Sequence, residues 1–107
     1  MAINVFKNVT ANLTTSGATL YTAPTGYTGI VLLAQISNLT GNTVAASMFV
    51  QKSGIQTSLA TDFDIPGNDA AGMLSGKLVL ETGQQIFASA SANTSAQLTL
   101  SILESQN

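Results

Sequence analysis

The fold is decided by residues 75–104, which read SGKLVLETGQQIFASASANTSAQLTLSILE. Three short runs in this stretch alternate apolar and polar residues. The apolar positions that share one face are Leu78 and Leu80, then Ile86, Ala88, Ala90 and Ala92, and finally Ala96, Leu98, Leu100 and Ile102. A period of two is typical of half-buried β-strands, and Gly83 and the segment Asn93-Thr94-Ser95 supply turn chemistry between the runs. The stretch therefore predicts a β-meander with one apolar face, which the rest of the chain must cover.

The rest of the chain repeats this alternation. Further strands are predicted at residues 3–9, 18–23, 27–39, 44–52 and 57–65, while residues 70–74 fit either a helical turn or a short strand. Turn signals recur at about every 8–12 residues, which is the spacing typical of all-β sandwiches. Residues 30–34 are apolar on both faces, so their strand is expected in the middle of a sheet or beneath a covering neighbour. We predict one all-β domain over residues 1–107, a single sandwich of about eight short antiparallel strands, either jelly-roll or immunoglobulin-like.

The composition argues against several classes of function. Cysteine, histidine and tryptophan are absent, charged residues make up 7% of the chain, and the formal net charge is -2. Three scattered lysines give no basic surface for nucleic acid or for an anionic membrane. The first residues do not resemble a signal peptide, and the longest apolar run is far shorter than a membrane span. We therefore expect neither nucleic acid nor membrane as a partner.

The sequence also offers few of the residues that catalysis or metal binding requires. Without histidine, a serine or threonine nucleophile would need a lysine as its base, and no Ser-x-x-Lys spacing occurs. Asp62, Asp64, Asn68 and Asp69 form the one acidic cluster, and their oxygens could hold Ca²⁺. Their spacing departs from the EF-hand pattern, because Pro66 stands where a ligand belongs. We expect a polar turn there, no enzyme activity, no cofactor and no metal.

Apolar residues on the outward faces of strands are the strongest functional signal. They form a candidate contact surface made of Leu33, Leu39, Phe49, Phe87 and Leu103. With few charges to oppose association, this pattern favours an oligomer or a docked subunit, although loops of the same chain could cover each residue. Tyr21 and Tyr27 bracket a Pro-Thr-Gly turn. They could form a ligand-binding rim, or they could cap the sandwich with their hydroxyls at the surface.

Several of these segments together carry a family resemblance. They are YTAPTGYTGIVL from Tyr21, a Gly-Asn turn, SGKLVLETGQQI from Ser75 and LTLSILES from Leu98. The combination resembles small virion structural proteins of tailed bacteriophages. The resemblance implies a virion component with no catalytic residues to carry over.

From the resemblance, the low charge and the outward apolar residues, we expect a capsid decoration or cement protein located in the virion. It would adhere to the major capsid protein, to other virion proteins or to sibling copies. A neck or tail-associated subunit is the first alternative. A carbohydrate- or host-binding module that uses Tyr21 and Tyr27, or the loop from Asp62 to Asp69, is the second.

Overall fold

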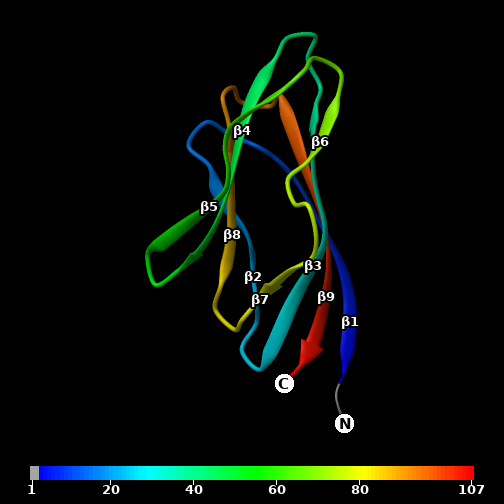
Figure 1. The fold of residues 1–107 in the computed structure, drawn as a ribbon, viewed down its shortest axis with the longest axis vertical. Coiled ribbons are helices and arrows are strands. Elements are labelled where there is room, and N and C mark those ends of the chain that lie inside the picture. The colour runs from blue at the N-terminus through cyan, green and yellow to red at the C-terminus, as the bar shows by residue number, and fades with distance from the viewer. Residues whose placement is uncertain (1–2) are drawn as a thin grey trace.

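The computed structural model describes residues 3–107, which form nine β-strands and an elongated body of 49 × 26 × 21 Å. The strands run along the long axis of the molecule (Figure 1). They are β1 (Asn4–Asn12), β2 (Ala18–Thr22), β3 (Tyr27–Asn38), β4 (Val44–Lys52), β5 (Ile55–Ile65), β6 (Ala70–Gly72), β7 (Leu78–Leu80), β8 (Gln85–Ala90) and β9 (Ala96–Gln106). Among these residues, no helix is long and apolar enough to cross a membrane.

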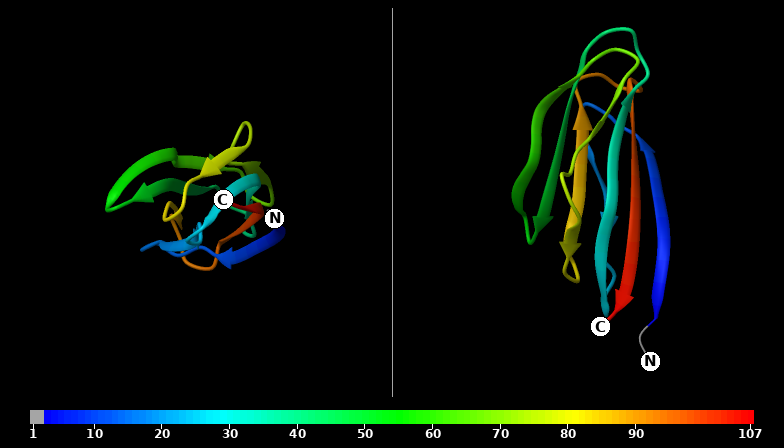
Figure 2. Two further views of the ribbon diagram at one scale, coloured as in Figure 1. Left: turned by 90° about the horizontal axis from the view of Figure 1, so that it is seen from below. Right: turned by 45° about the vertical axis from the view of Figure 1, so that its right-hand side comes forward.

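Two antiparallel sheets face each other across one core, as Figure 2 shows. The first sheet has the order β1-β9-β3-β6, with β7 also paired to β3, and the second has the order β2-β8-β4-β5. The pairings are nested. Along the sequence, the β4–β5 hairpin is enclosed by the pairing of β3 with β6 and β7. That pairing is enclosed by β2 with β8, which is in turn enclosed by β1 with β9. The chain is thus one long folded hairpin rolled into two sheets, which is the jelly-roll arrangement rather than the immunoglobulin one. The predicted all-β sandwich is confirmed.

The meander predicted for residues 75–104 is wrong. Its three strands do not pair with one another, because β7 and β9 belong to the first sheet and β8 belongs to the second. The turns between them therefore cross the core from sheet to sheet. Alternation marks which residues face inward, and that inward set is the same whether successive strands pair side by side or lie opposite each other. The stretch supplies both layers of the sandwich instead of one.

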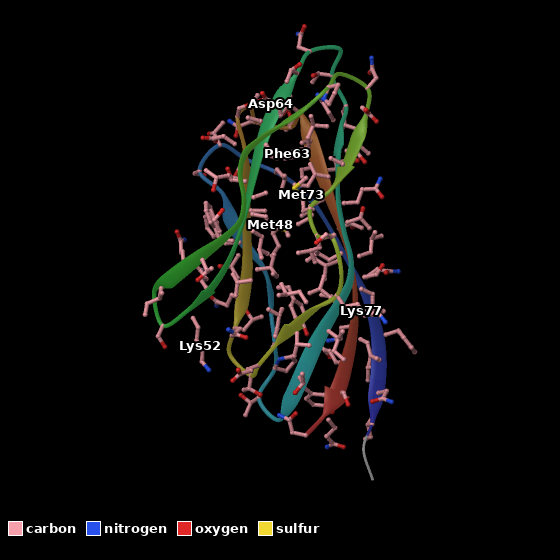
Figure 3. All side chains as sticks on the ribbon, viewed as in Figure 1. Met48, Lys52, Phe63, Asp64, Met73 and Lys77 are labelled. Carbon is pink, nitrogen blue, oxygen red and sulfur yellow. The ribbon has the colours of Figure 1, made fainter. Side chains whose placement is uncertain are left out.

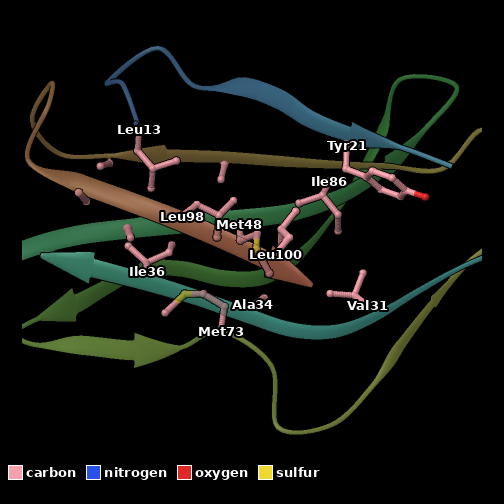
Figure 4. Packing of buried hydrophobic residues seen from close by; sticks show 14 of the residues in the cluster. Leu13, Tyr21, Val31, Ala34, Ile36, Met48, Met73, Ile86, Leu98 and Leu100 are labelled. Carbon is pink, nitrogen blue, oxygen red and sulfur yellow. The ribbon is translucent and has the colours of Figure 1, made fainter. Parts of the chain in front are cut away.

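The core consists of apolar side chains that point inward from both sheets (Figure 4). Leu98, Leu100 and Val31 enter from the first sheet, and Met48 and Ile86 enter from the second. All five side chains are no more than 1% exposed. The inward set that the alternation predicts in β9 is therefore confirmed. Met73, which follows the short strand β6, also lies in this core (Figure 3), so residues 70–74 form a strand end and not a helical turn.

The strand predicted from the doubly apolar residues 30–34 is β3, and it lies in the middle of the first sheet between β9 and the pair β6 and β7. Its register with β9 shifts between Val31 and Leu33. Such a bulge places two residues opposite one. As a result Leu32 and Leu33 are both exposed, at 39% and 42%, while Val31 on one side of them is buried. The second face of this strand is therefore open rather than covered.

Candidate interaction surfaces

An apolar row crosses the outer face of the first sheet. Phe6 of β1 lies opposite Leu103 of β9, Leu103 lies opposite Ile30 of β3, and Ile30 lies opposite Val79 of β7. Directly opposite residues on a sheet bring their Cβ atoms to about 4.5–5.5 Å, so the four side chains form a continuous line. Phe6 is 75% exposed and Val79 is 57% exposed. We call these four residues the apolar row.

A shallow hollow extends this surface along β3. It has a volume of about 330 Å³ and lies where β6 has ended and β7 has not yet begun. Leu32, Leu33 and Leu74 supply its apolar lining, and Lys77 places a charge at the same site. The apolar row and the hollow together leave the outer face of the first sheet with a long apolar surface and one adjacent cation.

The five residues predicted as one contact surface lie in three separate places. Leu33 and Leu103 lie on the outer face of the first sheet, beside or within the apolar row. Phe49 and Phe87 lie opposite each other on the second sheet, with ring centroids 6.2 Å apart and half-buried side chains. Leu39 lies in the loop after β3. The structure therefore divides the five into two pairs on opposite sheets, with Leu39 apart from both.

The phenylalanine pair is partly covered by its own chain. A Cβ atom at Gly17 would come within 2.6 Å of the Phe87 ring, so the loop before β2 lies directly against this side chain. Phe49 and Phe87 also shield each other in a tilted pair, an arrangement that is favourable for aromatic rings. Intramolecular packing thus accounts for much of this second patch.

Leu39 projects from a loop that is held rigidly. The side-chain amide of Asn38 is buried and donates to the carbonyl oxygens of Asn42 and Ile65 at 2.7 and 3.0 Å. Its oxygen accepts from the backbone N–H and the hydroxyl of Thr40, both at 2.9 Å. Leu39 itself is 52% exposed at this end of the sandwich, far along β3 from the apolar row.

Tyr21 does not form a surface rim, nor does its hydroxyl reach the surface. Its side chain is 8% exposed, and its hydroxyl donates a 2.6 Å hydrogen bond to the buried Oε2 of Glu104. The other oxygen of Glu104 lies 3.1 Å from Nζ of Lys7. Burial, and then the hydrogen bond and the charge of Glu104, raise the pKa of Tyr21 well above its usual range. Tyr27 is half-buried. In place of a pair of rim tyrosines, Tyr21 and Glu104 form a buried pair that the half-exposed Lys7 contacts from the edge of the sheet.

Gly29 makes room for this buried pair. It lies opposite Glu104 in the sheet, and a Cβ atom there would come within 2.9 Å of the Tyr21 hydroxyl oxygen. Because that oxygen is held by Glu104, the phenol has no free direction in which to retreat. We expect Gly29→Ala to lower the free energy of unfolding by about 1–3 kcal/mol. Chemical denaturation measures the change, with Gly76→Ala as control because its added Cβ meets nothing within 4 Å. Equal midpoints for the two variants would contradict the expectation.

The acidic residues do not gather into a metal site. Among residues 3–107, no group of three or more acidic side chains is placed to hold an ion. The Asp62 amide donates to the Ser47 hydroxyl at 2.9 Å, which ties β5 to β4, and Asp69 accepts from the neighbouring Ala70 amide. The structure therefore uses Asp62 to join two strands and Asp69 to shape a turn.

Sequence reasoning missed three members of the apolar row, Phe6, Ile30 and Val79. The alternation did place Phe6 on the face opposite Val5 and Val9, and the same alternation puts Val79 between two inward leucines. What could not be seen was that these outward residues lie in line. That alignment depends on the register of four strands, and the sequence carries no direct signal for it.

Comparison with known proteins identifies the fold alone. No protein-family model matches the chain, and no match is found among curated proteins. A solved structure described as "Bacillus endospore appendages form a novel family of disulfide-linked pili" is similar with a TM-score of 0.59 and 8% identity, over 99% of this chain and 88% of that one.

Two structures of infectious bursal disease virus are more distant. The VP2 subviral particle has a TM-score of 0.49 and 10% identity over 98% of this chain, and the Gx strain has a TM-score of 0.45 and 12% identity over 100%. This chain spans 32% of each. The pilus structure therefore shares its overall fold with nearly the whole of this chain, and the strand pairings define that fold as a jelly-roll sandwich.

Proposed function

We propose that this domain is a non-enzymatic structural subunit of a phage virion, most specifically a decoration protein that adheres to the outside of the capsid. The apolar row carries the proposal. It presents four apolar side chains in line across the first sheet, and its two end members are among the most exposed large hydrophobic residues described. Monomeric proteins rarely leave such a line open, whereas docking surfaces use it.

Composition and fold support the same function. With 7% charged residues, the chain has little electrostatic repulsion against a neighbouring subunit. Jelly rolls serve as viral capsid domains, and the similar solved structure comes from a pilus, so this fold is known in repeating assemblies. That pilus is described as disulfide-linked, while this chain has no cysteine. Adhesion in the present case would rest on buried apolar area.

A binding assay with undecorated capsids of the encoding phage tests the proposal. The double variant Phe6→Ser with Val79→Ser is expected to weaken co-sedimentation with capsids by at least about tenfold, because each buried apolar side chain contributes about 1.5–3 kcal/mol. Exposed positions have little effect on folding, so the thermal midpoint should stay close to that of the parent.

Ile55→Ser is the matched control. Ile55 is 73% exposed, almost as much as Phe6, but it belongs to β5 on the other sheet, at the projecting end of the β4–β5 hairpin (Figure 1). Its loss should leave capsid binding unchanged. Equal binding by the double variant and the parent would overturn the docking face. Density for the subunit at the neck or tail, in an image of the whole particle, would favour a neck or tail location over the capsid.

A further inference from the structure

The outer edge of β1 is the least protected strand edge in the molecule. Among the described residues, no strand pairs with it, and its register with β9 runs from Asn4 to Asn12 without a shift. The other edge strands are short or irregular. The edge strand β5 shifts register twice against β4, β2 is short and shifts once, and β6 and β7 have three residues each. Bulges and short lengths are among the devices that keep sheet edges from pairing with other chains, and β1 has neither of these two.

The one charge in β1 is partly neutralised by a carboxylate of the neighbouring strand. A lysine on an edge strand normally opposes the approach of a second strand. Lys7 belongs to the inward-facing set of β1, and its Nζ lies 3.1 Å from the buried carboxylate of Glu104, so its charge is paired although its side chain is 48% exposed. The outward-facing side chains of β1 are uncharged.

The free hydrogen-bonding groups of this edge can be assigned. The Ile3 carbonyl accepts from the Gln106 amide and the Leu13 amide donates to the Ala96 carbonyl, so the odd-numbered residues bond toward β9. In an antiparallel pair the bonded and non-bonded positions alternate. The N–H and C=O groups of Asn4, Phe6, Asn8 and Thr10 therefore point away from β9 in the plane of the sheet, where another strand can bond to them.

We propose that a second copy of this chain pairs with the edge, antiparallel and around a two-fold axis centred on Phe6. In this register Phe6 meets the same residue of the second copy, Asn4 meets Asn8, and Val5 meets Lys7, so no like charges are opposed. The choice of centre follows from the apolar row, which ends at Phe6 on the free edge. Pairing at Phe6 joins the two rows into one line across both first sheets.

The dimer formed through this edge alone is expected to be weak. An overlap of residues 3–9 on each copy is about 24 Å long at the usual rise of a strand. A contact of that length buries less than the roughly 1,200–2,000 Å² of a stable interface. The dimer should therefore form where copies are concentrated, as on a repeating particle surface. The inference rests on the proposed function in that it uses the same apolar row, but it is tested separately.

Cysteine cross-linking is the direct test, because the chain has no cysteine of its own. Bonded residues that face each other across antiparallel strands have Cα atoms about 5.5 Å apart, which lies within the range of disulfides. Phe6→Cys, oxidised with oxidised glutathione, is expected to form disulfide dimers at least tenfold faster than Asn8→Cys. The Asn8 pair is the matched control, since in this register its two copies are about 14 Å apart. A mixture of Asn4→Cys and Asn8→Cys should cross-link as heterodimers.

A proline variant tests the role of the free backbone groups. The Asn8 N–H points outward, so Asn8→Pro removes a donor to the second copy and leaves the backbone bonds to β9 in place, a placement in which edge strands tolerate proline. It also removes the exposed side-chain hydrogen bond that Asn8 Oδ1 accepts from the Ser101 hydroxyl at 2.9 Å. Combined with Phe6→Cys, it should reduce cross-linking at least tenfold and leave the fold intact by circular dichroism.

The outcomes separate the two proposals. Equal cross-linking by Phe6→Cys and Asn8→Cys, or no effect of Asn8→Pro, would overturn the edge pairing even if capsid binding through the row is retained. Specific cross-linking of Phe6→Cys, together with unchanged capsid binding by the Phe6→Ser and Val79→Ser variant, would overturn the docking face and leave the dimer standing.

Discussion

Replacing Leu100 by alanine is expected to lower the free energy of unfolding by about 2–5 kcal/mol. Leu100 is fully buried on β9, which lies between β1 and β3 in the first sheet. Its side chain points into the space between the sheets, next to residues of both (Figure 4). The cost combines lost apolar burial with the cavity that a rigid sandwich cannot close. Because a domain of this kind has a total stability of about 5–15 kcal/mol, the variant should unfold at a much lower denaturant concentration.

Leu33→Ala is the control for this prediction. Leu33 belongs to the adjoining strand β3, one register step from the partner of Leu100, but it points outward and is 42% exposed. The same chemical change should therefore cost much less there. Urea denaturation of both variants measures the difference, and similar losses would show that the outer face of the first sheet is packed as tightly as the core.

Removing the hydroxyl of Tyr21 is expected to change both the stability and its dependence on pH. Tyr21→Phe takes away the 2.6 Å hydrogen bond to a carboxylate that is only 3% exposed. The loss should cost about 1–3 kcal/mol at neutral pH, because the buried acceptor is left less satisfied. Tyr27→Phe, with a half-buried ring outside this buried pair, is the control and should cost less.

The pH dependence follows from the raised pKa of Tyr21, which burial and the Glu104 hydrogen bond cause in the folded protein. In the unfolded chain a tyrosine loses its proton near pH 10. Above that pH the unfolded state holds fewer protons than the folded state, so stability falls as the pH rises. The contribution is complete below about pH 10 and is lost in alkaline solution. Tyr21→Phe should remove most of this decline, and denaturation at pH 8 and pH 11 measures it. An equal decline in the variant would assign the effect to other groups.

The proposed adhesion and the proposed edge pairing use neighbouring parts of one surface. The apolar row projects from the outer face of the first sheet, perpendicular to its plane. The free backbone groups of β1 point sideways from its edge, in the plane of the sheet. A second copy at the edge would therefore leave the row open to a larger partner. Joining two rows would double the apolar line that such a partner meets. This arrangement gives a physical reason for a chain with so few charges to keep Phe6 exposed.

The sequence by itself determined the fold class, most strand positions and most inward-facing residues, although Ala92, expected on an apolar face, is exposed beyond the end of β8. Alternation located β4 at residues 44–52 and placed Leu98, Leu100 and Ile102 in the core, because apolar burial depends on local period alone. It also placed Leu33 and Leu103 outward. These properties follow from each segment's own residues, whichever strands it pairs with.

Only the tertiary structure decided which strands are neighbours. It placed β7 and β8 in different sheets, aligned Phe6 with Leu103 in an outward row, and turned Tyr21 inward toward Glu104. Each of these depends on register and pairing between segments distant in sequence. A period of two is satisfied equally by many pairings, and the energy that selects one comes from packing the whole core at once.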